Sequence, residues 1–330
     1  MFHFAKGSIG VLAALMLTAF QSAPPGLPPK LAALADNADA ARSFDYMALK
    51  AEGADLKALS DAVHMRTRID PDTRRCLTEA EAELQMNLAS ALAAVDQAAF
   101  SADRVAADEA LAKWRAFSQR IISGEPAAEP PFKWVSDRYA QARSESDPRV
   151  RELLLRTARD QLNRQVFSGG DQVWGELSPG ARIRVEAVLN RDMCETDGEN
   201  TAWLKADIAA NGWYLISTTG EHASSAAWLM AQHADRDRAF QREVLALLEP
   251  LVQTGETSAS SYAYLYDRVA VSGNRPQRYG TQGRCVARNL WEPDELEDPE
   301  RVQALRDEVE VGSLAEYTAH MHQYCADFSG

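Results

Sequence analysis

The chain has 330 residues, and its 35 Lys and Arg against 48 Asp and Glu leave a net charge of −13. A hydrophobic fraction of 46% is typical of a folded globular protein, and the length suffices for one large or two modest domains with a buried core. Nucleic acid and anionic membrane surfaces are disfavoured as partners, because both require a basic surface and the sequence has no local run of Lys and Arg.

The first 23 residues have the pattern of a signal peptide. Lys6 supplies a positive charge, and residues 9–20 form an apolar run that is too short to span a bilayer comfortably. Ala23 is the best small residue before a cleavage site, although Gln21 and Pro24 flank it poorly, and an uncleaved N-terminal anchor is the alternative. We therefore expect an exported protein, periplasmic or extracellular, whose mature chain has no membrane span.

Four cysteines remain after this segment, and an even number in an oxidising compartment favours disulfides. Four cysteines allow three pairings. The sequence has no CxxC motif, the spacing that would indicate a zinc or redox site. We prefer Cys285 with Cys325, which leaves Cys76 with Cys194. Four buried thiols are the alternative.

Most of the chain has helical periodicity. A Pro-rich spacer at residues 23–30 precedes it, and apolar residues recur at intervals of three, four or seven over residues 77–121. This pattern predicts two long helices packed on each other, with Ser101 as the N-cap of the second. Residues 124–131 (GEPAAEPP) break the pattern. We therefore predict a helical N-terminal region at 24–145 and a C-terminal helical domain at 146–330.

Several helix starts in the C-terminal half are marked by a capping residue followed by proline. They are Asp147-Pro148, Ser178-Pro179 and Asp298-Pro299, and Ser313 with Glu316 has the spacing of a capping box. Residues 277–291 alternate around two glycines, which suits a short hairpin or an irregular extended arm. The predicted fold class is mostly α, with this small β-hairpin or arm.

The standard catalytic signatures are missing from the sequence: it has no GxSxG, HExxH, GxGxxG or P-loop motif. Three blocks instead carry a resemblance to a bacterial domain-of-unknown-function family, number 6624. The blocks are residues 226–229 with 232–235 (AAWL, QHAD), residues 263–269 (AYLYDRV), and Gly273 with residues 277–282 (QRYGTQ). The insertion of Asn274-Arg275 before Pro276 departs from the family pattern.

Further residues on both sides fit the same family. They are Asp160-Gln161, Arg164, Asn200, Gly212-Trp213, Asp298-Pro299 and Arg306. The resemblance covers about residues 150–324 and identifies relatives without an activity that could be transferred.

His233 is the strongest candidate for chemistry. It follows an apolar helical segment, and Asp235 is expected to be the N-cap of the next helix, so Gln232, Asp235 and Asp237 surround the imidazole at one bend. A histidine beside a carboxylate is typical of general acid–base catalysis. The alternative to a catalytic role is that His233 and Gln232 only form hydrogen bonds with exposed backbone groups at the bend. His222, about three turns away, is expected to be a surface or helix-start residue.

A second group of polar residues follows. Asp267 could anchor Arg268, whose guanidinium would face a carboxylate or phosphate, although an Asp–Arg pair is more often a structural clamp. Four hydrogen-bonding side chains crowd around Gly280: Gln277, Tyr279, Thr281 and Gln282. Such crowding indicates either a loop that faces a ligand or an arm that is bound to the helices. Asp160 and Arg164 have the spacing of a helix-surface pair, and only the resemblance brings them towards the site.

The leading hypothesis is a hydrolytic or group-transfer enzyme acting on a small polar or anionic substrate of the cell envelope. His233 would be the acid–base and Asp235 its orienting partner. Arg268 would anchor the anion, with Gln232, Asp267, Gln277, Tyr279, Gln282, Asp160 and Arg164 around the substrate. A non-catalytic binding or interaction domain is the alternative. We expect no cofactor and no metal, including at His322 and Cys325; the sequence leaves the oligomeric state open.

Overall fold

The structure, a computed structural model, describes residues 26–127, 130–326 and 328. The predicted signal peptide at 1–23 lies outside the described residues. The mostly α fold is confirmed, with fifteen α-helices and one two-stranded sheet in the part that is described. None of the described helices is both long and apolar enough to cross a membrane.

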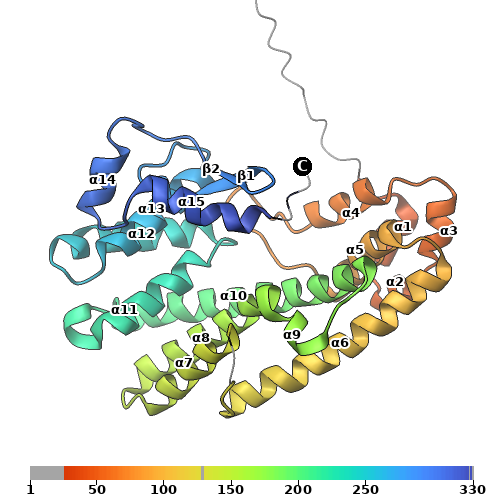
Figure 1. Ribbon diagram of the computed structural model, residues 1–330, viewed down its shortest axis with the longest axis horizontal. Helices are drawn as coiled ribbons and strands as arrows, with labels where there is room; N and C mark the ends of the chain where they lie inside the picture. Colours follow the sequence, from red (N-terminus) through yellow and green to blue (C-terminus); the bar gives the residue numbers. More distant parts are fainter. Residues whose placement is uncertain (1–25, 128–129, 327, 329–330) are drawn as a thin grey trace, which may run out of the picture.

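The N-terminal half begins with short helices and continues with long ones (Figure 1). Its helices are α1 (Pro29–Leu34), α2 (Ala38–Ser43), α3 (Tyr46–Ala51), α4 (Leu56–Met65), α5 (Glu79–Ala93), α6 (Gln97–Ser123) and α7 (Phe132–Ser144). The C-terminal half contains α8 (Pro148–Gly169), α9 (Asp171–Trp174), α10 (Pro179–Asn211), α11 (Ile216–Gln232), α12 (Arg238–Gln253), α13 (Ala259–Ser272), β1 (Gly283–Ala287), β2 (Leu290–Pro293), α14 (Val302–Glu308), α15 (Leu314–Met321) and the 3-10 turn η1 (His322–Cys325).

The two long helices expected within residues 77–121 are α5 and α6. Ser101 is not the N-cap of α6: Asp96 accepts the backbone N–H of Ala99 at 2.8 Å, and Ser101 bonds to the carbonyl of Gln97 inside the helix. The two helices make little contact with each other: both pack on α10, and α5 packs also on α4 and α2. Helix α10 runs through the middle of the molecule, from the N-terminal helices to α11 (Figure 1).

The expected capping residues are found at three helices. Asp147 caps α8, Ser178 caps α10 and Ser313 caps α15, each by accepting a backbone N–H of the first turn. Asp298 instead caps a turn, because its carboxylate accepts the N–H groups of residues 300 and 301 and α14 begins only at Val302.

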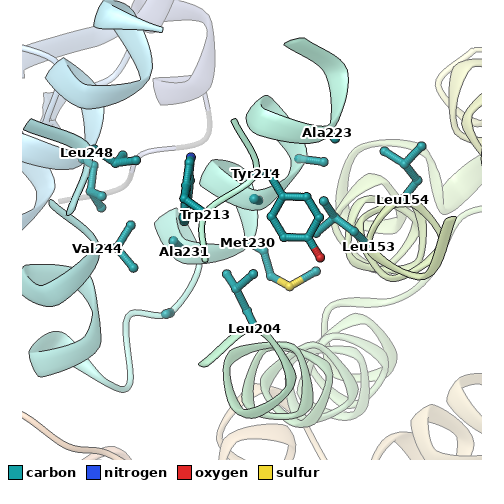
Figure 2. Close-up of a cluster of buried hydrophobic side chains, with 14 of the residues drawn as sticks. Leu153, Leu154, Leu204, Trp213, Tyr214, Ala223, Met230, Ala231, Val244 and Leu248 are labelled. Carbon is teal, nitrogen blue, oxygen red and sulfur yellow. The ribbon is translucent and has the colours of Figure 1, made fainter. Parts of the chain in front are cut away.

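The hydrophobic core does not divide at residue 146. One cluster joins α6 and α7 to α8 and α10, with Trp114 and Phe132 on one side of the boundary and Leu162 and Val185 on the other. A second cluster lies among α8, α10, α11, α12 and α13. Figure 2 shows Tyr214 and Met230 of this second cluster between α8 and α10. The first cluster thus crosses the predicted boundary, and the division into two domains stays a prediction.

Two disulfides hold the chain, with the pairing preferred from the sequence. Cys76 is bonded to Cys194 and Cys285 to Cys325, with Cα atoms 5.9 and 5.5 Å apart. The first joins the N-terminal region to α10. The second joins β1 to η1, beside the antiparallel pairing of β1 with β2 that confirms the expected small hairpin.

Candidate functional site

The bend between α11 and α12 consists of residues 233–237. Helix α11 ends at Gln232, and Asp237 caps α12 by accepting the backbone N–H of Phe240 at 2.9 Å. The expectation that Asp235 is this N-cap is wrong, because Asp237 is the residue next to the helix. The carboxylate of Asp235 is thus available to another element.

Asp160 of α8 holds the imidazole of His233. The Nδ1 atom of His233 lies 3.0 and 3.1 Å from the two carboxylate oxygens of Asp160, which is 3% exposed. A carboxylate can only accept, so we assign the proton to Nδ1, which leaves Nε2 as a proton acceptor in the neutral ring. Arg164 Nε also lies 3.1 Å from Nδ1, and in this tautomer it donates to Asp160 Oδ1 at 3.2 Å instead of to the ring. Among the described residues none hydrogen-bonds Nε2. Asp160 occupies the orienting position that the sequence assigned to Asp235, which makes no described hydrogen bond to His233.

Arg164 connects this pair to a carboxylate that sequence reasoning missed. Its Nη2 lies 3.1 Å from Asp160 Oδ1 and 2.7 Å from Asp197 Oδ1, and its Nε lies 3.1 Å from His233 Nδ1. Asp160 and Arg164 are thus a pair at i and i+4, as expected, but the pair faces inward against α10 and the bend. Its proximity to His233 is what the resemblance implied.

The two carboxylates have opposite pKa shifts. Burial alone would raise the pKa of Asp160, but the hydrogen bond and charge of His233, together with the charge of Arg164, lower it to about 2. Burial raises the pKa of Asp197 to about 7 against the charge of Arg164, and the anionic Asp160 adds to the rise. Near neutral pH the site thus pairs an anionic carboxylate with one that can carry a proton.

The imidazole and Asp197 line a pocket of about 580 Å³ between α10 and the bend. Lys205, Arg236 and Asp237 line the same pocket. Lys205 is paired with Asp237 at 2.7 Å. Arg236 donates to the carbonyl of Arg75 at 3.0 Å and makes no direct ion pair with a described residue, although the charges of Asp197 and Asp235 act on it from farther away.

A metal ion is one group that this donor set could hold. Atoms of Asp160, Asp197 and His233 lie within 4.8 Å of one another, as in carboxylate–imidazole metal sites. The guanidinium of Arg164 already bonds to both carboxylates. An ion would have to displace this resident cation, so the geometry fits an arginine-bridged acid–base cluster better than a metal centre.

Asp235 and Arg268 form an ion pair with each other, and neither lines the pocket at His233. The Nη1 atom of Arg268 donates to both oxygens of Asp235 at 2.8 and 2.7 Å, and the buried Gln241 donates to Asp235 at 3.1 Å. Asp267 does not anchor Arg268, because successive residues of a helix point in different directions. The pair therefore ties α13 to the bend.

Asp267 organises the loop at residues 277–282. Its fully buried carboxylate accepts the backbone N–H groups of Arg278, Tyr279 and Thr281 and the hydroxyl of Thr281, at 2.8 to 3.2 Å. Burial raises its pKa, although these donors oppose the rise. Of the two interpretations left open for this loop, the contacts match the arm bound to the helices.

The two glutamines of this loop hydrogen-bond within it. Gln277 is fully buried, donates to the carbonyls of Gln282 and Asp294, and accepts the N–H of Gln282. The side chain of Gln282 donates to the hydroxyl of Thr281 at 3.2 Å. Buried Arg306 donates to the carbonyl of Tyr279. These contacts bind Gln277, Tyr279 and Gln282 into the fold.

The remaining candidates lie apart from this network. Gln232 is buried and its Oε1 has no described partner. His222 is half-buried near the start of α11, and burial lowers its pKa. His322 accepts the backbone N–H of Trp291 at 3.0 Å, and Cys325 is in a disulfide.

Sequence reasoning missed Asp197 and Arg236. Asp197 lies one helical turn before Asn200, a residue of the resemblance, and Arg236 lies between the two aspartates of the bend. The spacing to Asn200 was the available signal for Asp197; Arg236 had none apart from its position at the bend.

The comparisons with known proteins identify the chain only at the level of a family. Neither the curated proteins nor the solved structures contain a match to it. Residues 149–326 match the model described as "Family of unknown function (DUF6624)", which is more than half of the chain. The chain therefore belongs to the DUF6624 family.

Proposed function

We propose that this protein is an exported enzyme, hydrolytic or group-transferring, that acts on a small polar or anionic substrate of the cell envelope bound in the pocket at His233. The observation that carries this proposal is the contact of His233 Nδ1 with buried Asp160, which leaves Nε2 without a described partner in a residue that lines the pocket. A carboxylate in this position holds one tautomer and stabilises the imidazolium that forms when Nε2 takes a proton.

In this proposal two neighbouring residues complete the site: Asp197 donates a proton and Arg236 binds the substrate. Asp197 has a pKa of about 7, so it can hold a proton near neutral pH and donate it to a leaving group. Arg236 offers a guanidinium without a direct ion pair at the pocket, which favours an anionic substrate. In this proposal Arg236 takes the anchoring role that the sequence suggested for Arg268.

Export is supported by two features of the chain. The N-terminal apolar run has the length of a signal-peptide core, and all four cysteines are paired in disulfides, which persist in oxidising compartments.

A non-catalytic envelope binding domain is the second candidate, and the loop at residues 277–282 favours it. Asp267 and Gln277, two residues of the family resemblance, are buried and satisfied mainly by backbone groups. Polar residues used in this way maintain a fold. In that case the pocket at His233 would bind a ligand without turning it over.

The test compares two histidines of the same segment. Mature wild type, His233→Ala and His222→Ala are assayed on p-nitrophenyl phosphate, p-nitrophenyl acetate and p-nitrophenyl glycosides. We expect kcat/KM to fall on the order of 10²- to 10⁴-fold in His233→Ala and to be unchanged in His222→Ala, with similar melting temperatures. Activity that survives His233→Ala contradicts the catalytic assignment. Ligand-induced stabilisation without turnover favours the binding domain.

A further inference from the structure

A second pocket, of about 360 Å³, is lined by α5, α6 and α10 and by Arg42 of α2. Arginine is the main charged residue of its lining: Arg42, Arg104, Arg115, Arg184 and Arg191. Three carboxylates also line it: Glu79, Glu83 and Asp108. None of these residues contributes to the pocket at His233.

Arg184 is the buried arginine of this pocket. It is 3% exposed, and its guanidinium donates to Asn87 Oδ1 and Ser90 Oγ, both at 2.9 Å. Its Cζ atom lies 4.6 Å from the centre of the Phe100 ring. Among the described residues no carboxylate ion-pairs with it. These neutral partners orient the guanidinium without a direct ion pair, and the charges of Glu83, Asp103 and Asp108 act on it only from farther away. A buried charge is costly without an anion in contact.

Two of the three lining carboxylates pair with Arg42, which lines the same pocket. Arg42 pairs with Glu83 at 2.9 Å and with Glu79 at 3.3 Å. Asp108 is exposed and has no ion pair with a described residue, so it is the one carboxylate of this lining that no described arginine pairs with directly.

The other arginines leave an excess of positive charge. Arg191 pairs with Glu195 at 3.4 Å, outside the pocket lining. Arg104 donates to a backbone carbonyl at 3.3 Å, and neither Arg104 nor Arg115 ion-pairs with a described residue. Together with Arg184, three unpaired guanidinium groups face one pocket in a chain whose net charge is −13.

We propose that this pocket binds a small anion with two or more negative charges, borne by phosphate or carboxylate groups. Guanidinium groups form paired hydrogen bonds with both kinds of anion, and a multivalent anion would satisfy several arginines at once. The site is independent of the function proposed for His233, because the two pockets share no residue.

The experiment measures anion binding by calorimetry on the full mature chain. Inorganic pyrophosphate and citrate are titrated separately, at low and at physiological ionic strength, so that the two arms distinguish phosphate from carboxylate recognition. The variants are Arg104→Gln and Arg115→Gln, which leave buried Arg184 in place. The matched control is Arg120→Gln, also on α6, whose partner Glu125 and surroundings lie outside this pocket.

We expect saturable binding of at least one probe, with the Kd raised about tenfold or more in each variant and unchanged in Arg120→Gln. Circular dichroism melting should show all three variants folded like the wild type. Two outcomes would overturn the proposal: neither probe binds saturably, or the control weakens binding as much as the two pocket variants, as expected for a non-specific effect of net charge.

Discussion

Asp160 precedes its partner His233 by 73 residues, whereas the carboxylate predicted for this role is two residues away. Local spacing favoured Asp235, but the bend turns that side chain towards Arg268 of α13. The buried side of the imidazole faces α8 instead. A histidine at a helix junction thus takes its partner from whichever helix packs beneath it, and this is decided by packing.

The first prediction concerns Asp160, whose carboxylate accepts the proton assigned to Nδ1 of His233. Asp160→Asn keeps the size of the side chain but removes the charge that stabilises the imidazolium. We expect kcat/KM to fall on the order of 10²-fold or more, measured on the substrate that the p-nitrophenyl panel identifies. Glu152→Gln, a more exposed carboxylate of the same helix paired with Arg156, is the control and should leave activity unchanged. Equal activity in the two variants would contradict the role of Asp160.

The second prediction is a pH dependence of stability that arises from Asp197. Its pKa is about 7 in the folded chain, whereas an unfolded Asp ionises near about 4. Between these values the folded state binds more protons, so the free energy of unfolding falls as the pH rises. Asp160 acts in the opposite direction at lower pH: its pKa of about 2 stabilises the fold above about pH 4, and this contribution is lost as the pH falls towards 2.

Denaturant unfolding at about pH 5 and about pH 8 tests this. The wild type should be less stable at the higher pH, and Asp197→Asn should reduce the difference. Glu199→Gln, an exposed residue of the same helix, should behave like the wild type. An unchanged pH dependence in Asp197→Asn would show that this carboxyl does not hold its proton in the folded chain.

At the scale of elements, the loop at residues 277–282 is an irregular segment ordered by one carboxylate. Three backbone N–H groups and one hydroxyl converge on Asp267, which takes the place of the hydrogen bonds that a helix or sheet would supply. Gly280 has a φ of +67°, and a Cβ there would lie 2.9 Å from Leu314 Cδ1. The conformation of the loop therefore depends on both residues.

The third prediction follows from these contacts. Asp267→Ala leaves buried N–H groups without acceptors, so we expect unfolding free energy to drop by at least about 3 kcal/mol. Asp294→Ala is the control: it removes the ion pair with exposed Arg284, which is worth up to about 1 kcal/mol. Urea denaturation compares the two. Equal losses would mean that water replaces Asp267 as the acceptor.

At the scale of the whole molecule, the N-terminal region supports the bend of the candidate site. The N–H of Arg74 donates to the carbonyl of Arg236 at 3.0 Å, and the N–H of Arg238 donates to the carbonyl of Asp72 at 3.1 Å. The disulfide from Cys76 fastens this N-terminal segment to α10. Residues outside the family domain thus help to position Arg236 of the pocket.

The fourth prediction concerns the two disulfides. They span 118 and 40 residues, and the chain-entropy relation gives about 5 and about 4 kcal/mol for loops of these lengths. Replacing Cys76 and Cys194 by Ser should therefore lower stability more than replacing Cys285 and Cys325. Alkylation of the denatured wild type should label none of the four cysteines unless a reductant is added. Labelling of all four without reductant would contradict both the pairing and the oxidised state.

The fifth prediction tests the boundary at residue 146. The fragment 146–330, with Cys194→Ser, is expected to be helical by circular dichroism but to melt at a lower temperature than the full chain. The reason is that it loses the apolar contacts of α6 and α7 with α8 and α10, and the backbone pairing of residues 72–75. A fragment without a cooperative transition would contradict the predicted division into domains. A fragment as stable as the full chain would show that the shared cluster adds little.

The sequence by itself determined the features that depend on neighbouring residues. Helical periodicity, the caps at Asp147 and Ser178, the small hairpin and the family membership all follow from short patterns, because hydrogen bonds within a few residues define helices and turns. The disulfide pairing preferred from the sequence, one of three possible pairings, is confirmed.

Only the tertiary structure decided which polar side chains share a surface. It placed Asp160, Arg164 and Asp197 around His233, paired Asp235 with Arg268, and enclosed Gln277 within the fold. Each of these contacts joins separate helices or a helix to a loop, and the rotation of one helix against another depends on how whole apolar faces fit together. No short pattern records that rotation, so the sequence identified most of these residues without showing which of them meet.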